Sequence, residues 1–422
     1  MNRSVERLRL SVTGVAPGQL VVSAFHHPAR GPVRASAAPL VVASLTGRGR
    51  DVLWGPEPRV VEASVAEAVQ FTVSYLERGG DAVGFGIAAR TDDPGGLLLA
   101  EWAVTDWAAA LRTRRVLLAG AEPLCSGARQ AGLLIAQAAE RQREPVHVLG
   151  ALGDCATATG PAEPEDVLTG SELSTVPEGA VVAYPAHGVA PEVHTEALLR
   201  GLRVVDATCP LVAAAHEEAR LVAGEGDTVV VIGDPAHRGV AALAEQAGPR
   251  AVVVSRPEEL ERLGEDPGRV SFVVHPGMEI PRAERVVRAL RARLRHVRGA
   301  HPDGYCYART DRAAVVRVVA ASSQACLVLG TPGTAEVADL VRLAHEAGTP
   351  VGVVRTLADL PYELIAAAPA VGVLTAGSAA PGLLEEVLDA LSGLGPMSVV
   401  RQTARTEVVK TAAPARSPVP AT

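Results

Sequence analysis

The sequence predicts an α/β protein with three similar units, preceded by a smaller α+β segment. From Arg114 onward, short apolar runs alternate with helical stretches, a pattern typical of parallel sheets covered on both faces. Cys125, Cys209 and Cys306 divide this region into stretches of similar length, which indicates an internal three-fold repeat. The expected boundaries are 1–113 for an N-terminal domain, 114–208, 209–300 and 301–400 for three α/β repeats, and 401–422 for a disordered tail.

The N-terminal segment contains all three tryptophans and lacks the repeat pattern. The alternation over Leu8–Val12 and the apolar run Leu20–Phe25 predict strands, whereas the spacing over Val61–Leu76 and Ala100–Leu111 predicts helices. The loop His26–Gly31 has two histidines. A polar turn between strands is its simpler interpretation, with an anion or metal site as the alternative, because no third ligand is near in sequence.

Short apolar runs predict the strands of the repeats. These runs are Val116–Ala119, Val146–Leu149, Val181–Tyr184, Val229–Ile232, Ala251–Val254, Ser271–Val274, Cys326–Leu329, Val351–Val354 and Val371–Leu374. A helical pattern begins just after each of the three repeat cysteines, and a helix N-terminus favours the thiolate form of cysteine. Three converging thiolates suit a metal or iron–sulfur cluster better than a disulfide framework. Cys326 lies inside an apolar run, so we expect a buried thiol of no chemical role.

Three predicted strands lead into a histidine: His187, His237 and His275. In open α/β sheets, ligands bind outside the carboxyl ends of the strands, and histidines there can bind an anion or move protons. Each histidine alone is more often a structural turn residue. Three of them, together with three loop cysteines, favour one shared polar site.

Composition excludes several classes of protein. The net charge of −7 argues against a general nucleic-acid binder, because neutralising phosphates needs a basic face. No apolar run reaches the ~18 residues of a membrane span, and Met1–Leu10 lacks the apolar core of a secretory signal. An odd number of cysteines, 5 in all, argues against structural disulfides. We therefore expect a cytoplasmic protein with no membrane partner.

Several short motifs occur in a characteristic order between about Arg115 and about Leu391. The most specific is Asp206–Val212, with His216 following it. The others are Leu124–Gly127, Ala186–Val189, Tyr305–Ala308 and Thr375–Pro381. In order and spacing these motifs resemble those of the 4-hydroxy-3-methylbut-2-enyl diphosphate reductase family, IspH/LytB.

The resemblance implies a trefoil of three α/β domains around a central 4Fe–4S cluster. By this resemblance Cys125, Cys209 and Cys306 ligate three irons, and the fourth iron is open for substrate. The implied reaction removes the allylic hydroxyl of a small diphosphate as water, giving isopentenyl and dimethylallyl diphosphate for isoprenoid biosynthesis. A ferredoxin or flavodoxin is the implied electron donor.

The resemblance also implies a set of substrate residues. They are His187, His237, Thr334 and Ser378, with Arg309 as a further source of positive charge and with His237 and Asp154 as candidate catalytic residues.

Other positions depart from the family pattern. Asp154 stands in place of a diphosphate-binding histidine, followed by Cys155, and Gly239 stands in place of a proton-delivering glutamate. Thr334–Glu336 replaces a Ser-Ser-Asn that grips diphosphate, and about Pro276 the family has a catalytic threonine. Three hypotheses therefore stay open: an authentic diphosphate reductase, a diverged 4Fe–4S reductase or dehydratase for another small oxygenated substrate, and a non-catalytic cluster-binding protein.

Overall fold

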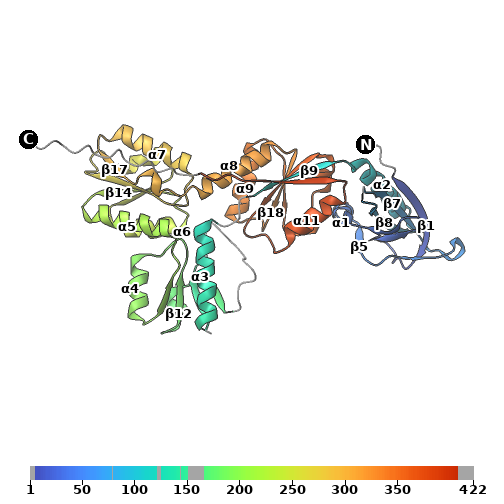
Figure 1. The fold of residues 1–422 in the computed structure, drawn as a ribbon, viewed down its shortest axis with the longest axis horizontal. Helices are drawn as coiled ribbons and strands as arrows, with labels where there is room; N and C mark the ends of the chain where they lie inside the picture. Colours follow the sequence, from blue (N-terminus) through green and yellow to red (C-terminus); the bar gives the residue numbers. More distant parts are fainter. Residues whose placement is uncertain (1–4, 78, 121–124, 143, 151–165, 407–422) are drawn as a thin grey trace, which may run out of the picture. The chain divides into compact units, whose positions relative to one another are not determined.

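The computed structural model describes residues 5–77, 79–120, 125–142, 144–150 and 166–406. The chain divides into two compact units (Figure 1). The first unit combines Met1–Pro123 with Ala313–Thr403, and the second combines Leu124–Arg312 with Ala404–Thr422. Within the described residues, no helix is both long and apolar enough to cross a membrane.

The second unit contains two parallel four-stranded sheets. The first sheet has the order β11 (Val167–Ser171), β10 (Val146–Leu149), β12 (Val181–Tyr184) and β13 (Arg203–Asp206). Helices α3 (Ser126–Gln142) and α4 (Pro191–Leu199) lie on its two faces (Figure 1). Every residue of β12 is buried as a result, which explains why its sequence is a continuous apolar run.

The other sheet of this unit has the same construction. Its order is β15 (Ala251–Val254), β14 (Thr228–Ile232), β16 (Val270–Val274) and β17 (Val297–Gly299). Helices α5 (Pro210–Gly224) and α6 (Arg238–Gln246) pack on one face, and α7 (Ile280–Arg293) packs on the opposite face. Since all eight strands of the two sheets are parallel within their sheets, the loops at their carboxyl ends are available for a site.

The first unit contains the third α/β sheet. Its order is β19 (Val351–Val354), β18 (Ala325–Leu329), β20 (Ala370–Thr375), β9 (Arg114–Ala119) and β21 (Met397–Gln402). Helices α8 (Ala308–Ala321) and α9 (Ala335–Glu346) cover one face, and α11 (Leu383–Ser392) covers the other, with α10 (Tyr362–Ala367) beside it. All nine apolar runs expected as strands of the repeats are confirmed as strands.

Two expected boundaries differ from the structure. Strand β9, which we assigned to the first repeat, pairs with β20 and β21 of the third sheet. The expected tail begins inside β21, because Arg401 pairs with Leu118. Residues from 407 onward lie outside the described part of the chain.

The N-terminal segment forms an eight-stranded mixed sheet with two helices. The main order is β3 (Phe25–His27), β4 (Gly31–Arg34), β8 (Ala82–Arg90), β7 (Ala68–Leu76), β1 (Glu6–Thr13) and β6 (Arg59–Val60), with β2 (Gln19–Ser23) and β5 (Asp51–Trp54) beside it, and with helices α1 (Ala38–Gly47) and α2 (Pro94–Ala110). The strands expected at Leu8–Val12 and Leu20–Phe25 and the helix expected at Ala100–Leu111 are confirmed.

The helix expected over Val61–Leu76 is wrong, because strand β7 occupies most of that range. Strand β7 contains the polar residues Gln70, Thr72 and Ser74. In the structure they are buried inside the sheet, where the Gln70 amide donates a hydrogen bond to the Ser23 hydroxyl at 3.0 Å. Pairing with both β1 and β8 therefore overrides the local apolar spacing.

The N-terminal sheet also differs from the separate domain that we expected. Many of its buried residues, such as Leu20, Val73 and Phe85, form one hydrophobic cluster with residues of β9, β18, β20 and α11. The Trp107 indole donates a hydrogen bond to the Gly393 carbonyl at 3.1 Å, and the buried Arg114 guanidinium donates to the carbonyls of Leu394 and Ala110. The segment therefore folds against the third α/β sheet within the first unit.

Candidate functional site

Three thiols of the second unit lie at the starts of helices. Cys125 precedes α3, Cys209 is the N-cap residue of α5, and Cys306 precedes α8. All three are half-buried. A side chain at Gly127 would place its Cβ 2.5 Å from the Cys209 Sγ and 4.0 Å from the Cys125 Sγ. Gly127 thus leaves the space in which two of these sulfurs approach each other.

The third thiol, Cys306, is near enough to the other two for them to influence its pKa. Burial raises the pKa of Cys306, the Ala308 backbone N–H lowers it, and the neighbouring Cys125 and Cys209 raise it further. Among the described residues, no group of three or more His, Cys, Asp or Glu could hold a metal ion. Ligands of an iron–sulfur cluster bind different irons, so a cluster needs wider spacing between its thiolates than a single ion needs.

Three histidines converge on Gly239 in the same unit. His187 follows β12, His237 is the N-cap of α6 after β14, and His275 follows β16. A Cβ built on Gly239 would lie 2.6 Å from the His275 Nε2, 3.1 Å from the His187 Cβ and 3.2 Å from the His237 Nδ1. The rings of His187 and His237 have centroids 6.4 Å apart, and those of His237 and His275 are 4.6 Å apart. The three histidines expected at these strand ends therefore lie together around Gly239.

Backbone hydrogen bonds assign the tautomers of these rings. The Gly239 N–H donates to the His237 Nδ1 at 3.1 Å, and the Gly277 N–H donates to the His275 Nδ1 at 3.0 Å. A nitrogen that accepts a hydrogen bond carries no proton, so both neutral rings hold their proton on Nε2. The His-x-Gly pattern at 237–239 and 275–277 is the sequence signal for this arrangement, and the strand-end histidines had already grouped His275 with the other two.

His187 has the opposite tautomer. Its Nδ1 lies 3.0 Å from the Gly188 carbonyl oxygen, which can only accept, so Nδ1 carries the proton and the neutral ring has its lone pair on Nε2. The cluster therefore combines two rings protonated at Nε2 with one ring protonated at Nδ1.

Burial keeps two histidines of this region neutral. His275 is 3% exposed, and its pKa is well below the ordinary value, first because of burial and then because of His237, His216, His187 and Arg309. Burial, followed by the Arg220 charge, lowers the pKa of His216 to about 4. His216 lies against Gly188, where a Cβ would be 2.7 Å from its Cε1 and where φ is +74°.

Positive charge surrounds the histidines. Arg309 in the first turn of α8 is close enough to lower the pKa of His275. Arg238 is exposed at the first position of α6, and its Nη1 would lie 2.8 Å from a Cβ on Gly150, the residue after β10. A helix N-terminus and an arginine both favour an anionic ligand.

Thr334 and Ser378 lie in the first unit, after strands β18 and β20 of the third sheet. The Thr331 N–H donates to the Ser378 hydroxyl at 3.0 Å, and the Thr334 hydroxyl donates to the Thr331 carbonyl at 3.0 Å. Thr334 also caps α9. In the same pair of loops, the Gly377 N–H donates to the Glu336 Oε2 at 2.8 Å. The structure therefore brings these two candidates together at one edge of that sheet.

The remaining sequence candidates have simple outcomes. Asp154 and Cys155 lie outside the described residues. Cys326 is fully buried in β18, and burial raises the pKa of its thiol to about 12, so the expected structural role is confirmed. The loop His26–Gly31 is the turn between β3 and β4, where the Ala29 N–H donates to the His27 Nδ1 at 3.1 Å. The simpler interpretation of that loop, a polar turn, is confirmed.

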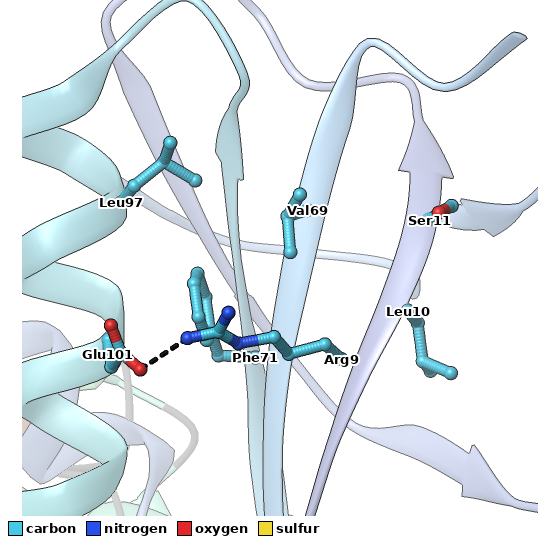
Figure 2. Close-up of a pocket in the computed structure, with 7 residues that line it drawn as sticks. All are labelled: Arg9, Leu10, Ser11, Val69, Phe71, Leu97 and Glu101. Carbon is cyan, nitrogen blue, oxygen red and sulfur yellow. Dashed lines mark hydrogen bonds and ion pairs between the residues drawn. The ribbon is translucent and has the colours of Figure 1, made fainter. Parts of the chain in front are cut away.

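A pocket of about 390 Å³ lies in the N-terminal sheet, between β1, β7 and α2 (Figure 2). The Arg9 guanidinium lies over the Phe71 ring, 5.0 Å from its centroid, and pairs with the Glu101 carboxylate. The charged groups of this pocket thus neutralise each other, and it is lined by neither cysteine nor histidine. The thiols and histidines of the second unit are the better candidate site.

Comparison with known proteins gives one consistent result. Residues 116–392 match the family described as LytB protein. The chain is 31% identical over 300 residues to 4-hydroxy-3-methylbut-2-enyl diphosphate reductase 2 of Mycobacterium bovis, a match that covers 70% of this chain and 91% of the relative. The reductase of Leifsonia xyli subsp. xyli is 32% identical over 284 residues, covering 67% of this chain and 84% of the relative.

Solved structures share the fold. The E-1-hydroxy-2-methyl-but-2-enyl-4-diphosphate reductase from Plasmodium falciparum matches with a TM-score of 0.60 at 19% identity, over 72% of this chain and 96% of the other. A second reductase structure, described as the terminal enzyme of the non-mevalonate pathway, matches with a TM-score of 0.50 at 22% identity, over 66% of this chain and 99% of the other.

Proposed function

The chain belongs to the LytB family, and we propose that it is an iron–sulfur reductase acting on 4-hydroxy-3-methylbut-2-enyl diphosphate in isoprenoid biosynthesis. Two electrons and two protons break the allylic C–O bond, the oxygen leaves as water, and isopentenyl and dimethylallyl diphosphate form. The observation that carries the proposal is the family match of residues 116–392, which contains three cysteines at helix starts.

The donor set fits a 4Fe–4S cluster. Cys125, Cys209 and Cys306 would hold it, because all three cysteines lie at helix starts and Gly127 leaves room beside two of the sulfurs. When bound, such a cluster supplies electrons and one open iron that acts as a Lewis acid toward a hydroxyl. The trefoil arrangement expected from the family belongs to this proposal.

This chain's own residues would bind and orient the substrate. His187 and His237 lie at strand ends next to the N-terminus of α6, and Arg309 adds positive charge, as binding of a diphosphate requires. His237 would also be placed to exchange a proton with the substrate. Thr334, Ser378 and Asp154 complete the proposed substrate residues.

A small redox protein would supply the electrons, and we propose a ferredoxin or flavodoxin. We place the reaction in the cytoplasm, where thiols stay reduced.

The test is purification without oxygen, followed by iron and sulfide analysis, EPR and a reductase assay with 4-hydroxy-3-methylbut-2-enyl diphosphate. We expect a brown protein with about four irons per chain, as one 4Fe–4S cluster requires, and formation of both diphosphate products. A colourless chain without iron after reconstitution would refute the proposal.

A second candidate function is reduction or dehydration of a different small oxygenated substrate. Glu336 favours this second function. Its carboxylate accepts the hydrogen bond of the Gly377 N–H, in the pair of loops that also carries Thr334 and Ser378. A carboxylate at that N–H repels a phosphate that would bind there. A cluster-loaded chain that leaves the diphosphate unchanged but reduces another allylic alcohol would support this function. A cluster-loaded chain that reduces neither would support the non-catalytic hypothesis.

A further inference from the structure

His275 has a buried nitrogen that the proposed function does not use. The side chain is 3% exposed, and its Nε2 has no hydrogen-bond partner among the described residues. A buried polar atom without a partner costs about 1–3 kcal/mol, so native proteins rarely keep one without a reason. The ring also cannot turn freely, because its Nδ1 is held by the Gly277 N–H at 3.0 Å.

The held tautomer makes this nitrogen a donor. Since Nδ1 accepts, the neutral ring carries its proton on Nε2, and Nε2 faces Gly239. His237 is held in the same way by the Gly239 N–H, and its ring centroid is 4.6 Å from that of His275. Two imidazoles with the same tautomer therefore stand side by side.

The absence of a side chain at residue 239 makes this arrangement possible. A Cβ there would lie 2.6 Å from the His275 Nε2, which is far closer than real Cβ atoms approach other atoms. Residue 239 and residue 275 thus compete for one volume, and in this chain the imidazole has it.

A neutral N–H donor suits an oxygen acceptor. Burial and the neighbouring rings and Arg309 keep His275 uncharged at neutral pH, and a neutral imidazole is a poor proton source but a good hydrogen-bond donor, as in other enzymes that polarise an oxygen. Arg309 and the N-terminus of α6 favour an anionic ligand at the same place.

We propose that His275 is a substrate-binding residue whose Nε2–H donates to a phosphoryl oxygen of the substrate next to Gly239. This inference rests on the proposed function for the identity of the substrate and adds a binding residue that replaces the side chain absent at position 239. The ligand class is a phosphate ester or diphosphate.

Calorimetric titration of the cluster-loaded chain with inorganic pyrophosphate tests the inference. We expect His275→Leu, which fills the volume without a donor, to weaken binding at least about tenfold, as loss of a hydrogen bond to a charged group does. His275→Gln, whose amide N–H can reach the same place, should stay within about threefold of the parent. The exposed His296, changed to Gln, is the control and should bind as the parent does.

Nitrogen-15 NMR of the histidine rings gives a readout that does not depend on turnover. The His275 signals are identified by their absence from the His275→Gln spectrum. We expect a proton on Nε2 and a downfield shift of that proton when pyrophosphate is added. A proton on Nδ1, no shift, or a His275→Leu chain that binds pyrophosphate like the parent overturns the inference.

The two proposals fail separately. If iron, sulfide and turnover are normal while His275→Leu has no effect on binding, only this inference is wrong. If the cluster does not assemble, the proposed function is wrong, and the NMR experiment still reports whether His275 donates to the anion.

Discussion

The change Gly127→Ala tests whether the thiols hold a cluster. Its Cβ would lie 2.5 Å from the Cys209 Sγ and 3.1 Å from the Cys209 Cβ. Contacts between such atoms are comfortable only from about 3.5 Å, so the sulfur must move by about 1 Å. Metal–ligand distances tolerate only about 0.2 Å. We therefore expect loss of most of the cluster, although alanine inside α3 should not harm the fold.

The assay is iron and sulfide per chain after anaerobic reconstitution, with the visible absorbance as a second measure. Gly132→Ala is the matched control, because it lies in the same helix and its Cβ would meet nothing within 4 Å. The control should keep its cluster and gain about 0.5–1 kcal/mol of stability. If Gly127→Ala holds as much iron as Gly132→Ala, the space beside Gly127 is not needed for the thiol arrangement, and the reasoning is refuted.

Three further predictions concern stability. The pKa of His216 is about 4 in the folded chain, against an ordinary value of 6.5, so the unfolded chain binds more protons between these two pH values. About 3 kcal/mol of folding stability is therefore lost as the pH falls from 6.5 to 4. Urea unfolding of His216→Gln at both pH values should show a smaller loss, and an equal loss would contradict this origin of the pH dependence. Gly239→Ala should destabilise the parent chain, but it should destabilise a chain that already carries His275→Ala much less. The double-mutant cycle should give a coupling energy of about 0.5–3 kcal/mol. Additive effects would mean that the two residues do not share a volume. Arg114→Met removes the guanidinium hydrogen bonds to the buried carbonyls of Leu394 and Ala110, which keep only their bonds from Arg112, and should cost about 1–3 kcal/mol in urea unfolding. A cost well below about 1 kcal/mol would show that water replaces the guanidinium.

The parallel sheets could be predicted because their strands are buried on both faces. Burial of this kind forces a continuous apolar run, such as Val181–Tyr184, and such a run can be recognised in sequence alone. Strand β7 was missed for the opposite reason. Its Gln70, Thr72 and Ser74 are buried polar residues, and their partners lie on strands that are distant in sequence.

Pairing between distant segments also explains the boundary differences. The division of the chain at the cysteines follows sequence order, but β9 joins a sheet whose other strands begin at Ala325. The shared core of the N-terminal sheet with that sheet depends on contacts such as Trp107 to Gly393, which no local pattern indicates.

The site shows the same division between local and non-local information. Cys125, Cys209 and Cys306 could be identified because each stands in a short motif before a helix. The place of His275 at a strand end could be predicted, but its proposed role as a donor depends on the side chain absent at Gly239, a residue in the first turn of α6. A glutamate introduced at position 239 would meet the His275 ring, because its Cβ would lie 2.6 Å from the His275 Nε2.

Gly239 and His275 therefore act together: the side chain absent at 239 leaves the volume that the His275 ring fills. A glutamate at 239 would place a carboxylate in the site. Replacing that glutamate by glycine, with no other change, would leave an empty volume. Here the volume is filled from the next strand end by an imidazole that is held neutral and presents an N–H instead of a negative charge. A glutamate at 239 would offer a proton to the ligand, whereas the His275 Nε2–H offers a hydrogen bond. The site therefore favours ligand atoms that accept a hydrogen bond over those that accept a proton. Such a site would retain a phosphorylated ligand through a hydrogen-bond donor, and the protons for reduction would have to come from a group other than this neutral imidazole.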